Sequence, residues 1–178
     1  AMLFSGVAIR VGSAVIYGYR TFPGRAQVTY TVPWTLATPS QIKAQVEQMV
    51  EAQRNNRIHM PSVLYIPPEW QGLLDGFFTI GDASAGITVP GRTIRDVLLS
   101  IDGIEEIKVA DMLRGTGEAI LVAMVREVVD LAIGQEPITV SEDWHFAMQT
   151  RFKTFAAWVP RLKADYDGRS GIVQLRPE

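Results

Sequence analysis

The sequence lacks residues on which several common chemistries depend. Its 178 residues include no cysteine and only two histidines. Without cysteine there are no disulfide bonds, no thiolate catalysis and no zinc sites built on cysteine. The sequence also lacks a large excess of charge of either sign, since its net charge is −2. We therefore expect no global attraction to nucleic acid or to an anionic membrane. No apolar run has the length of a membrane-spanning helix.

Motifs for covalent and phosphate chemistry are also missing. His59 and His145 are far apart in the sequence, each next to a methionine or an aromatic residue, and are predicted to be structural. There is no G-x-S-x-G and no H-E-x-x-H. The glycines at Gly81, Gly86 and Gly91 lack the G-K-[ST] ending of a phosphate-binding loop. The sequence thus predicts no catalytic residue, no cofactor-binding residue and no metal ligand.

A cluster of charged residues near the C-terminus has two interpretations. It marks either a site or, as we favour, an exposed charged turn, and its members are Arg161, Lys163, Asp165, Asp167 and Arg169.

The residues that are present predict a folded α+β protein. A hydrophobic fraction of 47% and a charged fraction of 20% are ordinary for a globular chain. Two helices have capping boxes, one starting at Thr38 with Gln41 and one at Thr93 with Asp96. The first helix carries a single apolar stripe, made of Ile42, Val46, Met49 and Val50. Helices early in the chain and strands late in it favour the α+β class.

Short apolar runs predict the strands. They cover residues 27–32, 63–66, 104–110, 119–125, 128–133, 138–141 and 172–175. Residues 77–92 are glycine-rich and have neither a helical nor a strand period, which predicts an exposed loop.

Residues 145–160 have the alternation of one long strand. Phe152 and Trp158 lie at even positions, whereas Arg151 and Lys153 lie at odd ones. Such a strand spans about 50 Å, more than a small core covers on both sides. We expect the even face to be buried and the odd face to be exposed to solvent. The alternative is a strand bent by a bulge and shared between two sheets of one domain.

The order of these elements resembles the C-terminal half of tailed-bacteriophage major capsid proteins, the Hong Kong 97-like fold that encapsulin shells share. The stretches that carry the resemblance are IYGYRTFPGRAQVTYT (16–31), VLYIPPEWQGLL (63–74), TIRDVLLSIDGIEEIKVAD (93–111), AMVREVVDLAIGQEPITVS (123–141) and FKTFAAWVPRLKADYDGRSGIVQL (152–175).

The resemblance implies three parts of the chain. Residues 1–36 are a lead-in after a missing spine helix, residues 37–142 an axial domain, and residues 143–178 part of a peripheral domain. The family's flexible arm, long hairpin and spine helix are not found in the sequence. We therefore expect the chain to be the C-terminal portion of a longer protein.

The resemblance also implies a function. The chain is expected to be a structural subunit, not an enzyme, that forms the pentamers and hexamers of an icosahedral phage or prophage shell. It would need no cofactor and no membrane, would bind no specific nucleic-acid sequence, and would be located in the virion after assembly in the bacterial cytoplasm, with portal or scaffold proteins as further partners. In such a shell the long strand would bury one face on its own domain and place the other beside a neighbouring copy or the missing spine helix. Phe152 and Trp158 would then be partly uncovered where the spine helix should lie. The residues expected at subunit contacts are Arg151, Phe152, Lys153, Trp158, Gly81, Gly86 and Gly91.

Two alternatives stay open at this point. One is an encapsulin-like compartment, in which the same fold encloses an enzyme instead of a genome. The other is a small α+β ligand-binding or enzymatic domain, which would have a deep polar pocket near His59 or His145.

Overall fold

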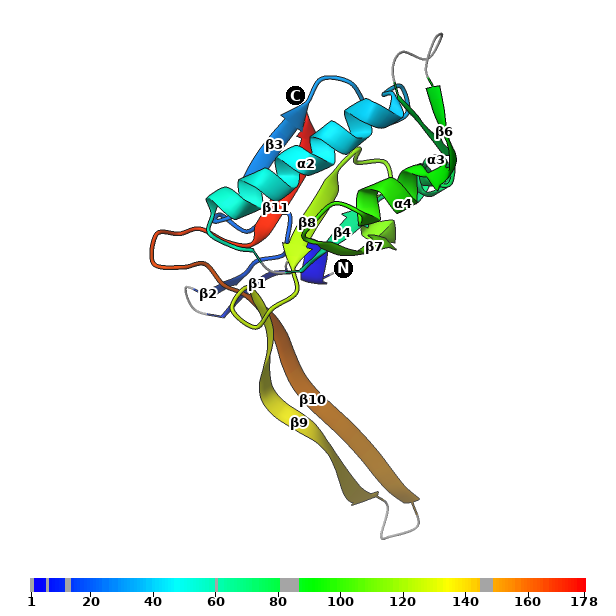
Figure 1. Cartoon of the computed structure of the whole chain (residues 1–178). Coiled ribbons are helices and arrows are strands. Elements are labelled where there is room, and N and C mark those ends of the chain that lie inside the picture. Colours follow the sequence, from blue (N-terminus) through cyan, green and yellow to red (C-terminus); the bar gives the residue numbers. More distant parts are fainter. Residues whose placement is uncertain (1, 6, 12–13, 60, 81–86, 145–148) are drawn as a thin grey trace.

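A long β-hairpin projects from a mixed α+β domain (Figure 1). The computed structural model describes the chain except for residues 1, 6, 12–13, 60, 81–86 and 145–148. No helix in these described ranges is long and apolar enough to cross a membrane.

Five strands form the central sheet of the domain in the order β3-β11-β8-β4-β7. β4 runs parallel to β7 and β11 parallel to β3, while β8 is antiparallel to both β4 and β11. The C-terminal strand is therefore inserted between an early strand and a late one. The five strands are β3 (Ala26–Tyr30), β4 (Ser62–Ile66), β7 (Ile104–Val109), β8 (Ala119–Ala123) and β11 (Ile172–Pro177).

Helix α2 (Pro39–Asn55) covers one face of this sheet. Thr38 is its N-cap, and both hydrogen bonds of the predicted capping box with Gln41 are present. The predicted apolar stripe is buried. A polar link also joins helix and sheet, because Gln53 donates to the Gly171 carbonyl at 2.8 Å and accepts from the Ser62 hydroxyl at 2.8 Å.

A second helix and a small hairpin complete this side of the domain. Helix α4 (Ile94–Leu99) starts at the predicted cap Thr93 with Asp96 in its box. Trp34 and Trp70 stack in the same core, with ring centroids 4.4 Å apart. The elements between β4 and α4 are η1 (Pro68–Trp70), α3 (Gln71–Leu74), β5 (Phe77–Ile80) and β6 (Ile87–Thr93).

The prediction that residues 77–92 form a loop is wrong for the described residues of this segment. β5 and β6 pair antiparallel, with Ile80 opposite Ile87 and Phe77 opposite Thr93. The prediction failed because glycine and proline normally argue against a strand, whereas Pro90 and Gly91 lie within β6.

The opposite face of the sheet has its own apolar cluster. Tyr19, Phe4 and Tyr65 pack edge-on or tilted against one another, with ring centroids 5.2 to 6.0 Å apart. The short elements on this side and at the sheet's margin are α1 (Met2–Ser5), β1 (Val7–Val11), β2 (Ala14–Ile16) and η2 (Asp111–Leu113).

Two strands make the projecting hairpin, β9 (Val129–Trp144) and β10 (Gln149–Leu162). They pair antiparallel along their whole length, from Leu162 opposite Val129 to Gln149 opposite Trp144. The sequence predicted two separate strands at 128–133 and 138–141. That prediction is wrong, because β9 is one continuous strand of 16 residues.

Candidate subunit interface

The foot of the hairpin is fixed by a group of opposite charges. Arg161 on β10 donates to both carboxylate oxygens of Asp130 on β9, at 2.9 and 2.6 Å. Lys163 Nζ lies 2.7 Å from the same carboxylate. Hydrogen bonds from Arg161 and then from Lys163 hold the pKa of Asp130 well below its usual range. Two of the five charged residues of the predicted turn thus belong to the hairpin foot.

The middle of the hairpin contains two bulges, both on β9. From Phe155 to Ala157 the partner residues run from Ile138 to Gln135, and from Ala157 to Trp158 they run from Gln135 to Ile133. Each step adds one residue to β9 that has no counterpart on β10. Gly134 and Pro137 lie in these two steps, where a missing side chain or a missing N–H is tolerated. They therefore bend the hairpin without ending it.

Side chains outside the bulges follow the two faces of an antiparallel ribbon. On one face Thr139 and Thr154 lie opposite each other, and their hydroxyls are 2.8 Å apart. On the other face Lys153 Nζ donates to Glu142 at 2.6 Å. The ribbon is thus ordered by cross-strand pairs.

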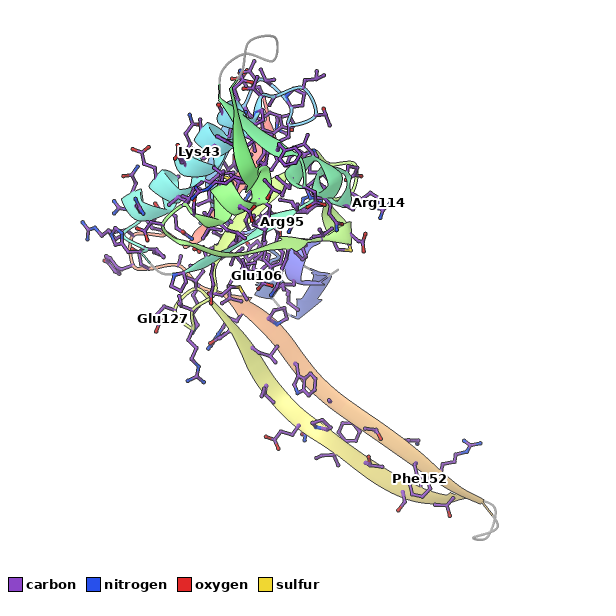
Figure 2. The ribbon with its side chains drawn as sticks, turned by 45° about the vertical axis from the view of Figure 1, so that its right-hand side comes forward. Lys43, Arg95, Glu106, Arg114, Glu127 and Phe152 are labelled. Atoms are coloured by element: carbon purple, nitrogen blue, oxygen red, sulfur yellow. The ribbon has the colours of Figure 1, made fainter. Side chains whose placement is uncertain are left out.

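Neither face of the outer hairpin packs on the domain. Phe152 is 71% exposed and Trp158 is 49% exposed, although both lie on the face predicted to be buried. Figure 2 shows Phe152 near the far end of the hairpin, well away from the domain. The expectation of one covered face is therefore wrong, because the hairpin leaves the domain instead of lying across it. Other exposed apolar side chains on the hairpin are Leu131, Ile133, Ile138, Val140, Phe155 and Val159.

An apolar groove lies where the hairpin meets β2. It encloses about 180 Å³. Val15 and Tyr17 form one wall, and both are partly exposed. The other wall comes from Ala132 on β9 and residues 159–162 on β10. The uncovered apolar surface of the hairpin therefore continues to its foot.

The predicted contact residues fall on two different parts of the molecule. Arg151, Phe152, Lys153 and Trp158 lie together on β10. Gly91 lies on β6, distant in sequence, with a φ of 74° that favours glycine. Gly81 and Gly86 lie outside the described residues. Contact of these residues with another subunit stays a prediction, as does the division at residue 142, a position that falls inside β9.

The apolar residues on β9 were not predicted as contact residues. Leu131 and Ile133 lie in the predicted strand 128–133, and Ile138 and Val140 lie in the predicted strand 138–141. The length of the predicted strand 145–160 was the signal that could have indicated the long strand β9, since so long a strand needs a partner of comparable length.

The histidines were the residues near which the alternative, a ligand-binding or enzymatic domain, would have a deep polar pocket. His59 is exposed and lines a space of about 270 Å³ with Arg54 and Asp102. His145 lies outside the described residues. In the described ranges no three acidic or histidine side chains are grouped so as to hold a metal ion.

Solved structures with a similar chain come from protein shells. One, "The capsid of Myoviridae Phage XM1", matches with a TM-score of 0.70 and 9% identity, over 99% of this chain and 59% of that one. A virus-like particle from Pyrococcus furiosus matches with a TM-score of 0.61 and 18% identity, over 89% of this chain and 58% of that one. The capsid of cyanophage P-SCSP1u matches with a TM-score of 0.50 and 11% identity, over 89% and 55%.

This likeness confirms the predicted α+β fold of phage capsid proteins. The chain spans less than three fifths of each of these three solved chains. A search of curated protein sequences gives no significant match. A family of similar sequences does match, over residues 1–175. The chain belongs to this family, which is described as a family of unknown function (DUF6260).

Proposed function

We propose that the chain is a structural subunit that self-associates into the icosahedral shell of a phage or prophage head. Its fold is that of chains from two phage capsids and a virus-like particle, which supports a role in a shell. On this proposal its main partners are further copies of itself, arranged in rings of five and six. Its role is structural, and it needs no cofactor.

The uncovered hairpin carries the proposal. Eight bulky apolar side chains on β9 and β10 are at least 36% exposed, and they lie on an arm that extends away from the domain. By the register they lie on both faces of the hairpin, and so much exposed apolar surface marks an interaction site in a stable protein. Its burial contributes roughly 25 cal/mol for each Å² removed from water. Because the domain has its own core, that free energy is available for contact with another chain.

The proposal extends to location and further partners. A phage head assembles in the bacterial cytoplasm and ends as the capsid of the virion, so we place the chain there. Portal or scaffold proteins are the further partners that such a shell takes.

An encapsulin-like compartment is the second candidate function. The Pyrococcus furiosus particle has the higher sequence identity to this chain, 18% against 9% for the myovirus capsid. The same hairpin contacts would serve both kinds of shell. The two functions therefore differ in what the shell encloses and not in the geometry of this chain.

Electron microscopy of the full-length natural product tests the proposal. We expect closed particles of uniform size. Particles that enclose nucleic acid indicate a phage head, and particles that enclose a single enzyme indicate a compartment. A product that stays monomeric at high concentration would contradict both functions. Phe152→Glu combined with Trp158→Glu is the matched variant, and it should keep the circular dichroism of the folded domain but form no particles.

A further inference from the structure

The two strands of the hairpin have unequal outer edges. Among the described residues, β9 and β10 form a two-stranded sheet and pair only with each other. Each strand therefore has one edge whose backbone N–H and C=O groups have no strand partner. Such an edge is a template for pairing with another chain.

The outer edge of β9 is interrupted. Both bulges add a residue to this strand, and Pro137 lacks the N–H that a further strand would need. β10 has no bulge, and residues 149–159 contain neither glycine nor proline. A long uninterrupted edge is thus present on β10 alone.

The residues of β10 are suited to a strand with neighbours on both sides. Thr150, Phe152, Thr154, Phe155 and Trp158 are of the types enriched in strands. A long exposed edge of this composition associates indiscriminately unless something covers it. The edge therefore calls for a defined partner.

We propose that the outer edge of β10 pairs antiparallel with β10 of a second copy across a two-fold axis, with Phe155 opposite Phe155. This inference rests on the proposed function and names the contact through which two subunits join. The two hairpins then form one four-stranded sheet in the order β9-β10-β10-β9. Because the contact is two-fold, the same edge serves both copies.

Charge and symmetry select the register. A two-fold axis between antiparallel strands keeps even-numbered residues opposite even-numbered ones. One residue, here called the centre of the register, therefore lies opposite the same residue of the other copy. Centres at 151, 152 and 153 place like charges opposite each other, because Arg151 and Lys153 then face themselves or one another. A centre at 156 places Phe152 opposite Pro160 and Trp158 opposite Thr154, so it pairs neither aromatic side chain with another.

A centre at Phe155 gives better pairs than the remaining centre at Thr154. It places Phe152 of each copy opposite Trp158 of the other, which gives two aromatic pairs. With the centre at Thr154, the same two residues lie opposite Ala156 and Thr150. With the centre at Phe155, Lys153 lies opposite Ala157, so its ammonium group stays paired with Glu142 of its own hairpin.

Cysteine cross-linking of the whole chain tests this register. The chain has no cysteine, so each introduced thiol is unique. Directly opposed residues have Cβ atoms about 4.5–5.5 Å apart, close to the range for a disulfide, whereas residues two positions out of register are too distant. Phe155→Cys should form a disulfide-linked dimer under mild oxidation. Thr154→Cys and Ala156→Cys should each form little disulfide-linked dimer alone. The two variants should cross-link when mixed, since residue 154 of one copy lies opposite residue 156 of the other.

A control variant and an independent measurement separate the outcomes. Gly72→Cys places a thiol on the open surface of the domain, where no atom lies within 4 Å of the added Cβ, and should give no dimer. Equal cross-linking of Thr154→Cys and Ala156→Cys alone would indicate face-to-face packing and overturn the proposed register. The register would also be overturned if sedimentation showed association but no cysteine at residues 154–156 formed a cross-link. In both cases the proposed function stands, whereas a chain that never associates would contradict the function itself.

Discussion

Asp130 and Arg161 face each other across the foot of the hairpin, joined by two hydrogen bonds of 2.9 and 2.6 Å. Lys163, just beyond the end of β10, lies 2.7 Å from the same carboxylate, so two cations hold Asp130. Arg161 also lines the groove beside β2. The foot therefore combines this charged pair with an apolar groove, and exposed apolar side chains continue from it along the hairpin.

The hairpin foot should make stability depend on pH below about pH 4. The pKa of Asp130 is lowered by hydrogen bonds from Arg161 and Lys163, so the native state favours the charged carboxylate. This contribution is complete above the unfolded-state pKa of about 3.9 and is lost as the pH falls through the lower folded-state value. The free energy of unfolding of Asp130→Asn should therefore fall less steeply between pH 5 and pH 2 than that of the wild type.

The matched control for this prediction is Asp167→Asn, which removes the same charge from an exposed turn. Asp96 has a lowered pKa too, because of its hydrogen bonds with Thr93, and remains in both variants. Parallel pH profiles for the wild type and Asp130→Asn would contradict the assignment. Denaturant unfolding at each pH provides the measurement.

The two capping boxes should each contribute measurably to the stability of the domain. Thr38→Ala and Thr93→Ala remove the side-chain acceptors for the N3 amides of α2 and α4. Each substitution should lower the free energy of unfolding by about 1 kcal/mol. Thr→Ser at the same positions keeps the acceptor and should recover most of the loss. Equal losses for serine and alanine would mean that the methyl group, not the cap, is responsible.

Tryptophan substitutions should distinguish the core from the hairpin. Trp70 is buried and stacks on Trp34, so Trp70→Ala should lower the free energy of unfolding by roughly 3–5 kcal/mol. Trp158 is half exposed on the hairpin, so Trp158→Ala should change it by only about 0.5 kcal/mol. Urea titrations followed by circular dichroism compare the two. A large loss for Trp158→Ala would show that this side chain supports the fold of a single chain.

Two glycines should respond in opposite ways to alanine. A Cβ at Gly171 would lie 2.8 Å from Val128 and 2.9 Å from Ala123, both well packed. Gly171→Ala should therefore destabilise the domain by about 1–3 kcal/mol. At Gly72 no atom lies within 4 Å of an added Cβ, and Gly72→Ala in helix α3 should be neutral or stabilising by up to about 1 kcal/mol. Thermal unfolding of both variants tests the packing around the start of β11.

Local signals in the sequence were sufficient for the helices and the central sheet. The capping residues Thr38 and Thr93 start the two longest helices, and residues 63–66 form the core of β4, as predicted. These signals are reliable because a cap or a buried apolar run depends on neighbours close in sequence.

The hairpin could not be predicted in the same way. Gly134 and Pro137 normally end a strand, and only the register of β9 against β10 shows that they lie at bulges. The alternation in residues 145–160 reported two faces correctly but contained no information on what covers them. Whether a face is buried depends on contacts distant in sequence or on another chain, and Phe152 illustrates this with 71% of its surface exposed.

Sedimentation velocity across a concentration series is the most direct test of the central claim, that the exposed hairpin joins subunits. The wild-type chain should sediment faster as its concentration rises, because Phe152 and Trp158 become buried between copies. The Phe152→Glu, Trp158→Glu variant should remain a monomer with an unchanged unfolding midpoint. A wild-type chain that is strictly monomeric at every concentration, or a variant that associates as the wild type does, would contradict the account.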